Sequence, residues 1–257
     1  MNIQLIALDL DGTLLRSDKL ISERTVSALR RCKEKGIKIV LVTARSFLTS
    51  IYAKDAVSAD LLVVNGGAEI RRGEETLFSL SLPKALAGEI ISYAAALPSF
   101  YRVTAETDDG RFFVSGCTGR GGPWDYSNAE VRELKAPIDS DMYKLVVFLG
   151  DDSDRVALTE RYSELAVFTY VGTEATFIAQ SGAQKWNGLS IAADILGVST
   201  ENTVVFGDDA HDKEMIERCG VGVAMGNAID SVKSAADFIA KTADDDGVAE
   251  WIETYLL

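Results

Sequence analysis

The chain has 257 residues, of which 47% are hydrophobic and 25% charged, and it carries a formal net charge of −13 at pH 7. This length and apolar content can bury a sizeable core in one large or two modest domains, and they exclude a disordered chain. The acidic excess argues against nucleic acid and anionic membranes as partners, because binding to both relies on an excess of Lys and Arg.

The cysteines predict a reducing cytoplasm as the location. Cys32, Cys117 and Cys219 show no CxxC spacing, and the chain has a single histidine. Zinc sites and disulfide frameworks therefore have little support. We expect no signal segment ahead of the polar residues that begin at Asp9, and no apolar run reaches membrane-spanning length.

The first part of the chain alternates predicted strands and helices. Ile3 to Leu8 is a nearly unbroken apolar run, which is typical of a strand covered on both faces in a parallel sheet. Ser22 predicts the N-cap of a helix that ends at Gly36, and a strand from Ile37 to Val42 follows. The same alternation continues over 47–64 and predicts βαβ units.

The middle of the chain has a different pattern. Helices are predicted over 85–97 and 155–165, and the segments around them have the spacing of antiparallel strands and hairpins. The predicted strands are 100–106, 112–115, 142–149, 167–171 and 176–180. After them the alternation of helices and parallel strands resumes, from a helix over 187–196 to a terminal helix that ends at Tyr255.

The predicted fold is therefore α/β. Residues 1–82 and 183–257 are expected to form a Rossmann-like core with a doubly wound parallel sheet, and residues 83–182 an inserted α+β domain.

Polar side chains follow several of the core strands. Asp9 and Asp11 follow the first strand, where an Asp-Gly turn with solvated carboxylates is an equally good interpretation of the pair alone. Thr43 and the cluster from Asp208 to Asp212 follow two other strands, and Lys185 precedes a helix. Because ligands bind outside the carboxyl ends of parallel strands, these residues are expected to converge there. Together they supply what a metal-assisted phosphoryl transfer requires.

At these residues the whole chain resembles the haloacid dehalogenase superfamily of phosphatases, and within it the Cof-like branch with a large α/β cap (type IIB). The matching motif residues are Asp9 and Asp11 (first motif), Thr43 (second), Lys185 (third), and Asp208 with Asp212 (fourth). Supporting matches are Asn65-Gly66-Gly67, Met225-Gly226-Asn227-Ala228 and Asp246-Gly247-Val248-Ala249. Three positions depart from the family: Ala44 and Trp186 stand where glycine is usual, and His211 stands where asparagine is usual.

The resemblance implies a magnesium-dependent phosphatase that acts on a small phosphorylated metabolite. Asp9 would attack phosphorus to form an aspartyl-phosphate, and Asp11 would protonate the leaving oxygen, which requires a raised pKa. Thr43 would hold phosphate oxygens, and Lys185 would bridge the phosphate and Asp9. The implied Mg²⁺ ligands are Asp9, Asp208, the backbone carbonyl of Asp11, and Asp212 through water.

Some polar residues have two interpretations each. Arg45 either contacts substrate or caps its helix, and Asn65 either contacts substrate or serves an Asn-Gly turn. His211 is a poor magnesium ligand, because that ion prefers hard oxygen, so a supporting or helix-entry role is favoured. Asp209 is predicted to be an acid in a turn or at a helix N-terminus.

The inserted domain would act as the cap, closing over the core and selecting the leaving group, and sugar phosphates are the first expectation for the substrate. A glycine-rich segment, 116–122, flanks Arg120, Trp124 and Tyr126. An ordinary flexible loop is favoured over a substrate-facing one, because glycine-rich connections are common without function.

Two other functions stay open. A phosphosugar mutase would pass the phosphate to a second sugar hydroxyl and would release no free phosphate. A non-catalytic phosphoryl-accepting sensor, similar to response-regulator receivers, would form a stable aspartyl-phosphate without turnover. The sequence leaves the oligomeric state open.

Overall fold

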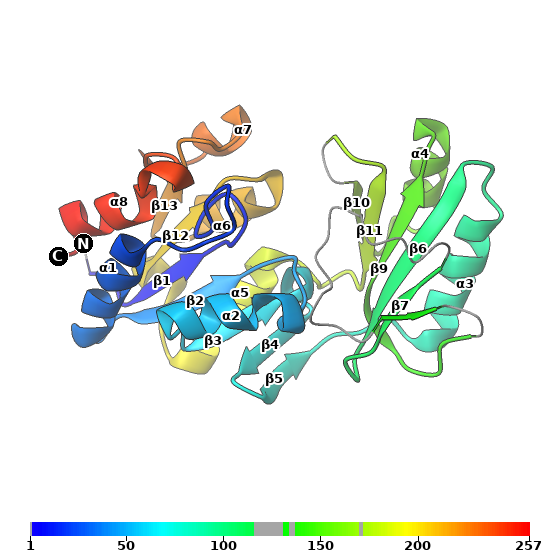
Figure 1. Cartoon of the computed structure of the whole chain (residues 1–257), viewed down its shortest axis with the longest axis horizontal. Coiled ribbons are helices and arrows are strands. Elements are labelled where there is room, and N and C mark those ends of the chain that lie inside the picture. Colours follow the sequence, from blue (N-terminus) through cyan, green and yellow to red (C-terminus); the bar gives the residue numbers. More distant parts are fainter. Residues whose placement is uncertain (1, 116–130, 134–136, 170–171) are drawn as a thin grey trace. The chain divides into compact units, whose positions relative to one another are not determined.

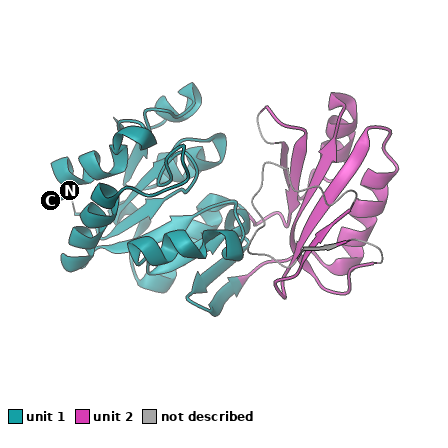
Figure 2. Ribbon diagram, viewed as in Figure 1, with its two compact units in different colours: residues 1–78, 184–257 teal, residues 79–183 magenta. Residues whose placement is uncertain are grey.

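The computed structural model describes residues 2–115, 131–133, 137–169 and 172–257, and the side chains of Val131 and Arg132 are left out of the description. The chain divides into two compact units (Figure 2): unit 1 is Met1–Phe78 with Gln184–Leu257, and unit 2 is Ser79–Ala183. The predicted bounds of the insert were 83 and 182. The glycine-rich segment with Arg120, Trp124 and Tyr126 lies outside the described residues.

Unit 1 is built on an eight-stranded sheet with the order β14-β13-β12-β1-β2-β3-β4-β5 (Figure 1). The neighbouring strands from β14 to β3 are parallel, and β4 runs antiparallel to β3. The strands are β1 (Leu5–Leu8), β2 (Lys38–Val42), β3 (Leu61–Val64), β4 (Glu69–Arg72), β5 (Glu75–Ser79), β12 (Thr203–Gly207), β13 (Val221–Ala224) and β14 (Phe238–Ile239).

Helices cover both faces of this sheet, which explains why its central strands are apolar throughout. In β1, Ile6 and Leu8 pack on one side, whereas Leu5 and Ala7 pack on the other. The first side is covered by α1 (Glu23–Glu34), α2 (Phe47–Val57) and α8 (Gly247–Tyr255). The second side is covered by α5 (Lys185–Leu196), α6 (Lys213–Arg218) and α7 (Asp230–Lys233).

Local sequence signals account for several helix ends. The Ser22 side chain accepts a hydrogen bond from the backbone N–H of Thr25, as predicted for an N-cap. Lys185, expected to precede a helix, is instead the first residue of α5. Four short 3₁₀ turns complete the unit: η1 (Asn65–Gly67), η2 (Thr200–Asn202), η3 (Ala210–Asp212) and η4 (Ala243–Asp245).

Unit 2 has a six-stranded sheet with the order β10-β11-β9-β6-β7-β8. Its neighbouring strands are antiparallel except for β7 and β8, which are parallel. The strands are β6 (Phe100–Thr107), β7 (Phe112–Val114), β8 (Val131–Glu133), β9 (Met142–Leu149), β10 (Ala166–Thr169) and β11 (Ala175–Ala179). Helices α3 (Lys84–Ala95) and α4 (Asp152–Arg161) share one apolar core with this sheet.

The predicted fold class, an α/β core with a parallel sheet and an α+β insert, is confirmed. The sequence did not predict β4, β5 or β8. No helix in the part of the chain that the structure describes is long and apolar enough to cross a bilayer.

Candidate active site

The order of the strands brings the predicted site residues to one edge of the core sheet. From β1 the chain continues to β2 on one side, while β12 lies on the other side. The register pairs Leu8 with Phe206, so that Asp9 and Asp208 follow adjacent parallel strands at the same edge. Such a reversal of strand order is where open α/β sheets bind ligands.

Lys185 joins two of the acids. Its Nζ donates to Oδ1 of Asp9 at 2.7 Å and to Oδ1 of Asp212 at 2.7 Å, and all three side chains are buried. Burial alone would lower the pKa of Lys185, but the charges of Asp212 and Asp9 outweigh it and raise the pKa. The lysine is therefore a fixed cation held between two carboxylates from separate strand ends.

Three carboxylates form an oxygen-only cluster that fits a divalent cation. One carboxylate oxygen each of Asp9, Asp208 and Asp212 lies within 4.8 Å of the others. Burial and then the charge of Asp212 raise the pKa of Asp208 to about 7. The same two causes raise the pKa of Asp9, although Lys185 opposes them. A cation among these oxygens would offset their repulsion and favour the ionised forms.

Asp212 also shapes the loop that carries Asp208. Its Oδ2 accepts the backbone N–H groups of Asp208 and Asp209, each at 3.0 Å. Asp209 in turn caps η3 by accepting from the N–H of His211, which confirms its prediction as a helix N-terminal acid. With Lys185 on Oδ1, Asp212 accepts three hydrogen bonds, which suits a contact with a cation through water better than a direct one.

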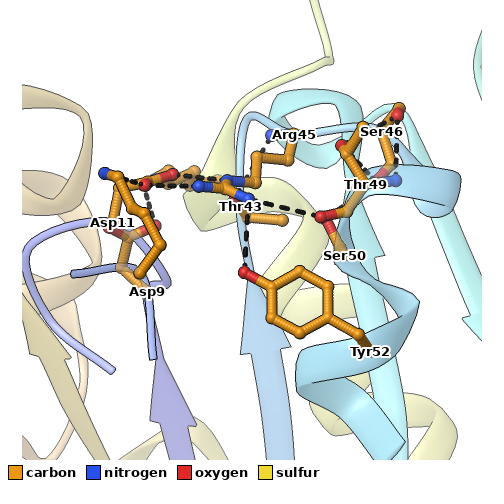
Figure 3. A network of polar contacts seen from close by, with 10 residues as sticks. Asp9, Asp11, Thr43, Arg45, Ser46, Thr49, Ser50 and Tyr52 are labelled. Atoms are coloured by element: carbon orange, nitrogen blue, oxygen red, sulfur yellow. Dashed lines mark hydrogen bonds and ion pairs between the residues drawn. The ribbon is translucent and has the colours of Figure 1, made fainter. Parts of the chain in front are cut away.

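Asp11 is not part of this cluster and instead pairs with Arg45 (Figure 3). Arg45 donates to both of its carboxylate oxygens, from Nε at 2.6 Å and from Nη2 at 2.7 Å, and Lys19 adds a contact of 2.9 Å. Burial would raise the pKa of Asp11, but the hydrogen bonds and charges of Arg45 and Lys19 lower it below its usual value. The expectation of a raised pKa for Asp11 is therefore wrong for this arrangement.

Arg45 was predicted either to contact substrate or to cap its helix, but in the structure it binds Asp11. Its Nη1 contacts the carbonyl of Thr49 at 3.3 Å and the hydroxyl of Tyr52 at 3.4 Å, both from α2 (Figure 3). The hydroxyl of Thr43 accepts the backbone N–H of Arg45 at 3.1 Å. That hydroxyl can still donate its own hydrogen to a phosphate oxygen.

Asn65, Trp186 and His211 are the other positions that the sequence analysis singled out. Asn65 is buried at the end of β3 and donates its backbone N–H to the carbonyl of Arg45. Trp186 in α5 is partly buried against the apolar core on that side of the sheet, and the Arg218 guanidinium lies 4.8 Å from its ring centre. Burial lowers the pKa of His211.

Sequence reasoning missed three contact residues of the site. Lys19 contacts Asp11, whereas Thr13 and Asn227 both donate to the carboxylate of Asp208. Thr13 and Asn227 belong to motifs that the sequence does contain, but their spacing gives no sign of which acid they contact. Arg45 was named from the sequence, but its pairing with Asp11 was not predicted.

Comparisons with known proteins identify the family of the chain. A family model described as haloacid dehalogenase-like hydrolase matches residues 6–252. The 5-amino-6-(5-phospho-D-ribitylamino)uracil phosphatase YitU of Bacillus subtilis is 30% identical over 98% of this chain and 97% of its own length. An HMP-PP phosphatase of Citrobacter koseri is 28% identical over 88% of this chain and 85% of its own. A haloacid dehalogenase-like hydrolase of Bacteroides thetaiotaomicron has a similar solved structure, with a TM-score of 0.84, 27% identity, and coverage of 98% of this chain and 99% of that one.

Proposed function

Because the chain belongs to the haloacid dehalogenase-like hydrolases, and within them to the Cof-like phosphatases, we propose that it is magnesium-dependent and hydrolyses sugar phosphates through an aspartyl-phosphate on Asp9. The matching family model and the named relatives confirm the family and the enzyme class that the motifs indicated, which is a phosphatase for small phosphorylated compounds. The metal, the intermediate, the residue roles and the substrate are the proposed part.

The contact of Lys185 with Asp9 is the observation that carries the proposal. An ammonium group 2.7 Å from Oδ1 of Asp9 keeps that carboxylate in place and favours its ionised, nucleophilic form. The same cation lies where it would offset charge on an attached phosphoryl group. Thr43 follows the neighbouring strand, and its hydroxyl hydrogen would donate to a phosphate oxygen.

Asp11 has to change partners before it can act as the general acid. In the structure its two oxygens are engaged by Arg45, and a bidentate guanidinium favours the carboxylate form. Its side chain is 41% exposed, so rotation away from Arg45 meets no tightly packed shell. Once released and protonated, Asp11 would protonate the leaving oxygen and later take a proton from the hydrolytic water.

Asp9, Asp208 and Asp212 would hold Mg²⁺, together with the backbone carbonyl of Asp11. When bound, the cation would neutralise phosphate oxygens and so lower the barrier to attack by an anionic carboxylate. Asp9 is oriented for this attack by Lys185, whereas Asp208 and Asp212 supply the other carboxylate oxygens of the cluster.

The substrate class is supported by the name of a relative. YitU is a phosphatase for a compound with a phosphorylated ribityl group, which is a polyol phosphate. Cys32 and Cys219 are free and buried, which supports the proposed cytoplasmic location. The net charge of −13 supports a small metabolite, in preference to nucleic acid, as the partner.

Phosphate release from a panel of sugar, nucleotide and cofactor phosphates, with and without Mg²⁺, tests the proposal. We expect turnover with Mg²⁺, none after EDTA treatment, and preference for sugar or polyol phosphates. Full activity after rigorous chelation, or restoration by Zn²⁺ but not by Mg²⁺, would contradict the metal assignment. Transfer to a second sugar hydroxyl without free phosphate would indicate the mutase, and a stable phosphoprotein without turnover the sensor.

A further inference from the structure

We propose that Thr13 and Asn227 are positioning residues that hold the carboxylate of Asp208 for a divalent cation. This inference rests on the proposed function, because it concerns the metal site of the same reaction. Thr13 Oγ1 donates to Oδ1 of Asp208 at 3.1 Å, and Asn227 Nδ2 donates to Oδ2 at 3.3 Å. Each oxygen of Asp208 thus accepts one hydrogen bond from a different loop and keeps a lone pair for a cation.

The orientation of the Asn227 amide follows from its other two partners. Its Nδ2 also donates to the carbonyl of Gly12 at 2.7 Å, and its Oδ1 accepts the backbone N–H of Ala243 at 3.0 Å. A carbonyl only accepts and a backbone N–H only donates, so that the reversed amide would face two mismatched partners. The donor end of Asn227 therefore points towards Gly12 and Asp208.

Asn227 links three loops that the sheet alone leaves separate. Gly12 follows β1, Asp208 follows β12, and Ala243 lies in η4 after β14. The Gly12 carbonyl and the Asp208 carboxylate share one amide group, so the loop of the nucleophile and the loop of the second acid cluster are fixed to each other. Displacement of either loop would strain the other through this side chain.

The need for such support comes from the charges around Asp208. Asp208 follows β12, which neighbours the strand that precedes the buried Asp9. The charge of Asp212 acts on the carboxylate of Asp208. In the absence of restraints, repulsion would turn its carboxylate outward. Gly12 gives it room on the other side: a Cβ at Gly12, whose φ is +74°, would lie 2.2 Å from Oδ2 of Asp208.

Direct metal binding tests the inference independently of catalysis. Mn²⁺ binding, measured by electron paramagnetic resonance without substrate, should weaken roughly 10-fold or more in Thr13→Val and in Asn227→Ala, as is common when groups that orient metal ligands are removed. The magnesium concentration for half-maximal hydrolysis of p-nitrophenyl phosphate should rise in parallel. Saturating Mg²⁺ should recover most of the wild-type rate, which a variant with a merely damaged fold would not do.

Two matched controls separate positioning from general damage. Thr203 is buried like Thr13, but its hydroxyl donates to the carbonyl of Ser199 at the start of β12, the end away from Asp208. Asn2 is exposed ahead of β1, at the end of that strand away from Asp9. Thr203→Val and Asn2→Ala should bind Mn²⁺ as the wild type does, even if thermal unfolding shows that the buried change lowers stability.

The possible results distinguish this inference from the proposed function. Unchanged Mn²⁺ affinity in both Thr13→Val and Asn227→Ala would overturn the positioning role, and so would equal weakening in the two controls. A wild-type protein that binds Mn²⁺ but hydrolyses no phosphate ester would overturn the proposed function alone. A wild type without Mn²⁺ binding would overturn both.

Discussion

The two units treat buried charge in opposite ways. In unit 1, Asp9, Asp208 and Asp212 bring three like charges together, with Lys185 as the cation between two of them. In unit 2, Lys144 stands directly opposite Glu106 on neighbouring strands, 3.4 Å away, so that one charge matches one partner. Matched pairs are compatible with stability alone, whereas a cluster of like charges costs stability and is retained where it binds something. The difference supports unit 1 as the place of the proposed chemistry.

The largest effect should come from removing the two acids of the first loop. Asp9→Asn would remove the proposed nucleophile and Asp11→Asn the proposed acid, so each should reduce phosphate release by about 10³-fold or more, as expected for groups that act in the chemical step. Circular dichroism should show both proteins folded. A near-native rate for Asp9→Asn would exclude covalent catalysis by this residue.

The second-largest effect should come from replacing Lys185, the cation between Asp9 and Asp212. Lys185→Met leaves Asp9 and Asp212 buried without their shared partner, so that turnover should fall about 10²-fold for every ester alike, as for other groups that stabilise transition-state charge. The matched change in unit 2 is Arg111→Met, which removes a cation that Asp109 and Asp139 share at the surface. That variant should hydrolyse p-nitrophenyl phosphate like the wild type. Equal losses in both variants would remove the distinction between the units.

Substitutions beside the glycine-rich segment of the insert, residues 116–122, should have a smaller effect on turnover, and one that depends on the substrate. Arg120→Ala or Trp124→Ala should change the ranking among natural phosphate esters several-fold, by about 1 kcal/mol in relative barrier height. Hydrolysis of p-nitrophenyl phosphate should be spared, because its leaving group needs little recognition. Equal losses for all esters in kinetic profiling would contradict the expectation that the insert selects the leaving group.

The smallest effect concerns stability against pH in EDTA. The pKa of Asp208 is raised to about 7 by burial and by Asp212, so the folded state keeps a proton that the unfolded state releases near its ordinary pKa of 3.8. The free energy of unfolding should therefore fall as pH rises from about 4 to about 7. We expect a melting temperature roughly 2–8 °C lower at pH 8 than at pH 5.

Mg²⁺ should reverse this loss at pH 8, because it binds the ionised carboxylates. Asp208→Asn, which has no such proton to lose, should show a weaker dependence on pH. An unchanged dependence in Asp208→Asn would place the responsible proton elsewhere, with Asp9 as the next group to test, since its pKa is also raised.

The sequence was most informative where one pattern decides the structure. Apolar strands such as Ile3 to Leu8 and capped helices such as the one after Ser22 follow from periodicity and local hydrogen bonds. The hairpin of β4 and β5 was missed, because its charged residues do not resemble a core strand. Glu69 is buried there, and Arg71 pairs with it at 2.9 Å, a contact that no propensity encodes.

The motifs identified which residue types to expect in the site but not where the side chains point. Lys19 has a left-handed backbone, with a φ of 65°, and its side chain reaches back to Asp11. Arg45 reaches the same carboxylate from the end of another strand. Such contacts depend on loop conformations and on rotamers. The spacing of the motif residues along the sequence could therefore reveal neither the salt bridges nor the lowered pKa of Asp11. The start of α5 was predicted two residues too late, at 187 instead of Lys185. The residue before the helix, Gln184, makes no side-chain capping bond that could have marked the start.

The division of unit 1 into two stretches of sequence has a consequence for biosynthesis. Asp9 and Lys185 are separated by 176 residues, and all of unit 2 is translated between them. Contacts between such distant residues carry a high loop-closure cost and form late. At about 5–20 residues per second, a ribosome completes unit 2 roughly 1 to 5 seconds before it completes β12, the strand that precedes Asp208. The nascent chain therefore exposes one half of a parallel sheet during synthesis, and premature truncation anywhere before β12 would leave β1 with an unpaired edge open to aggregation.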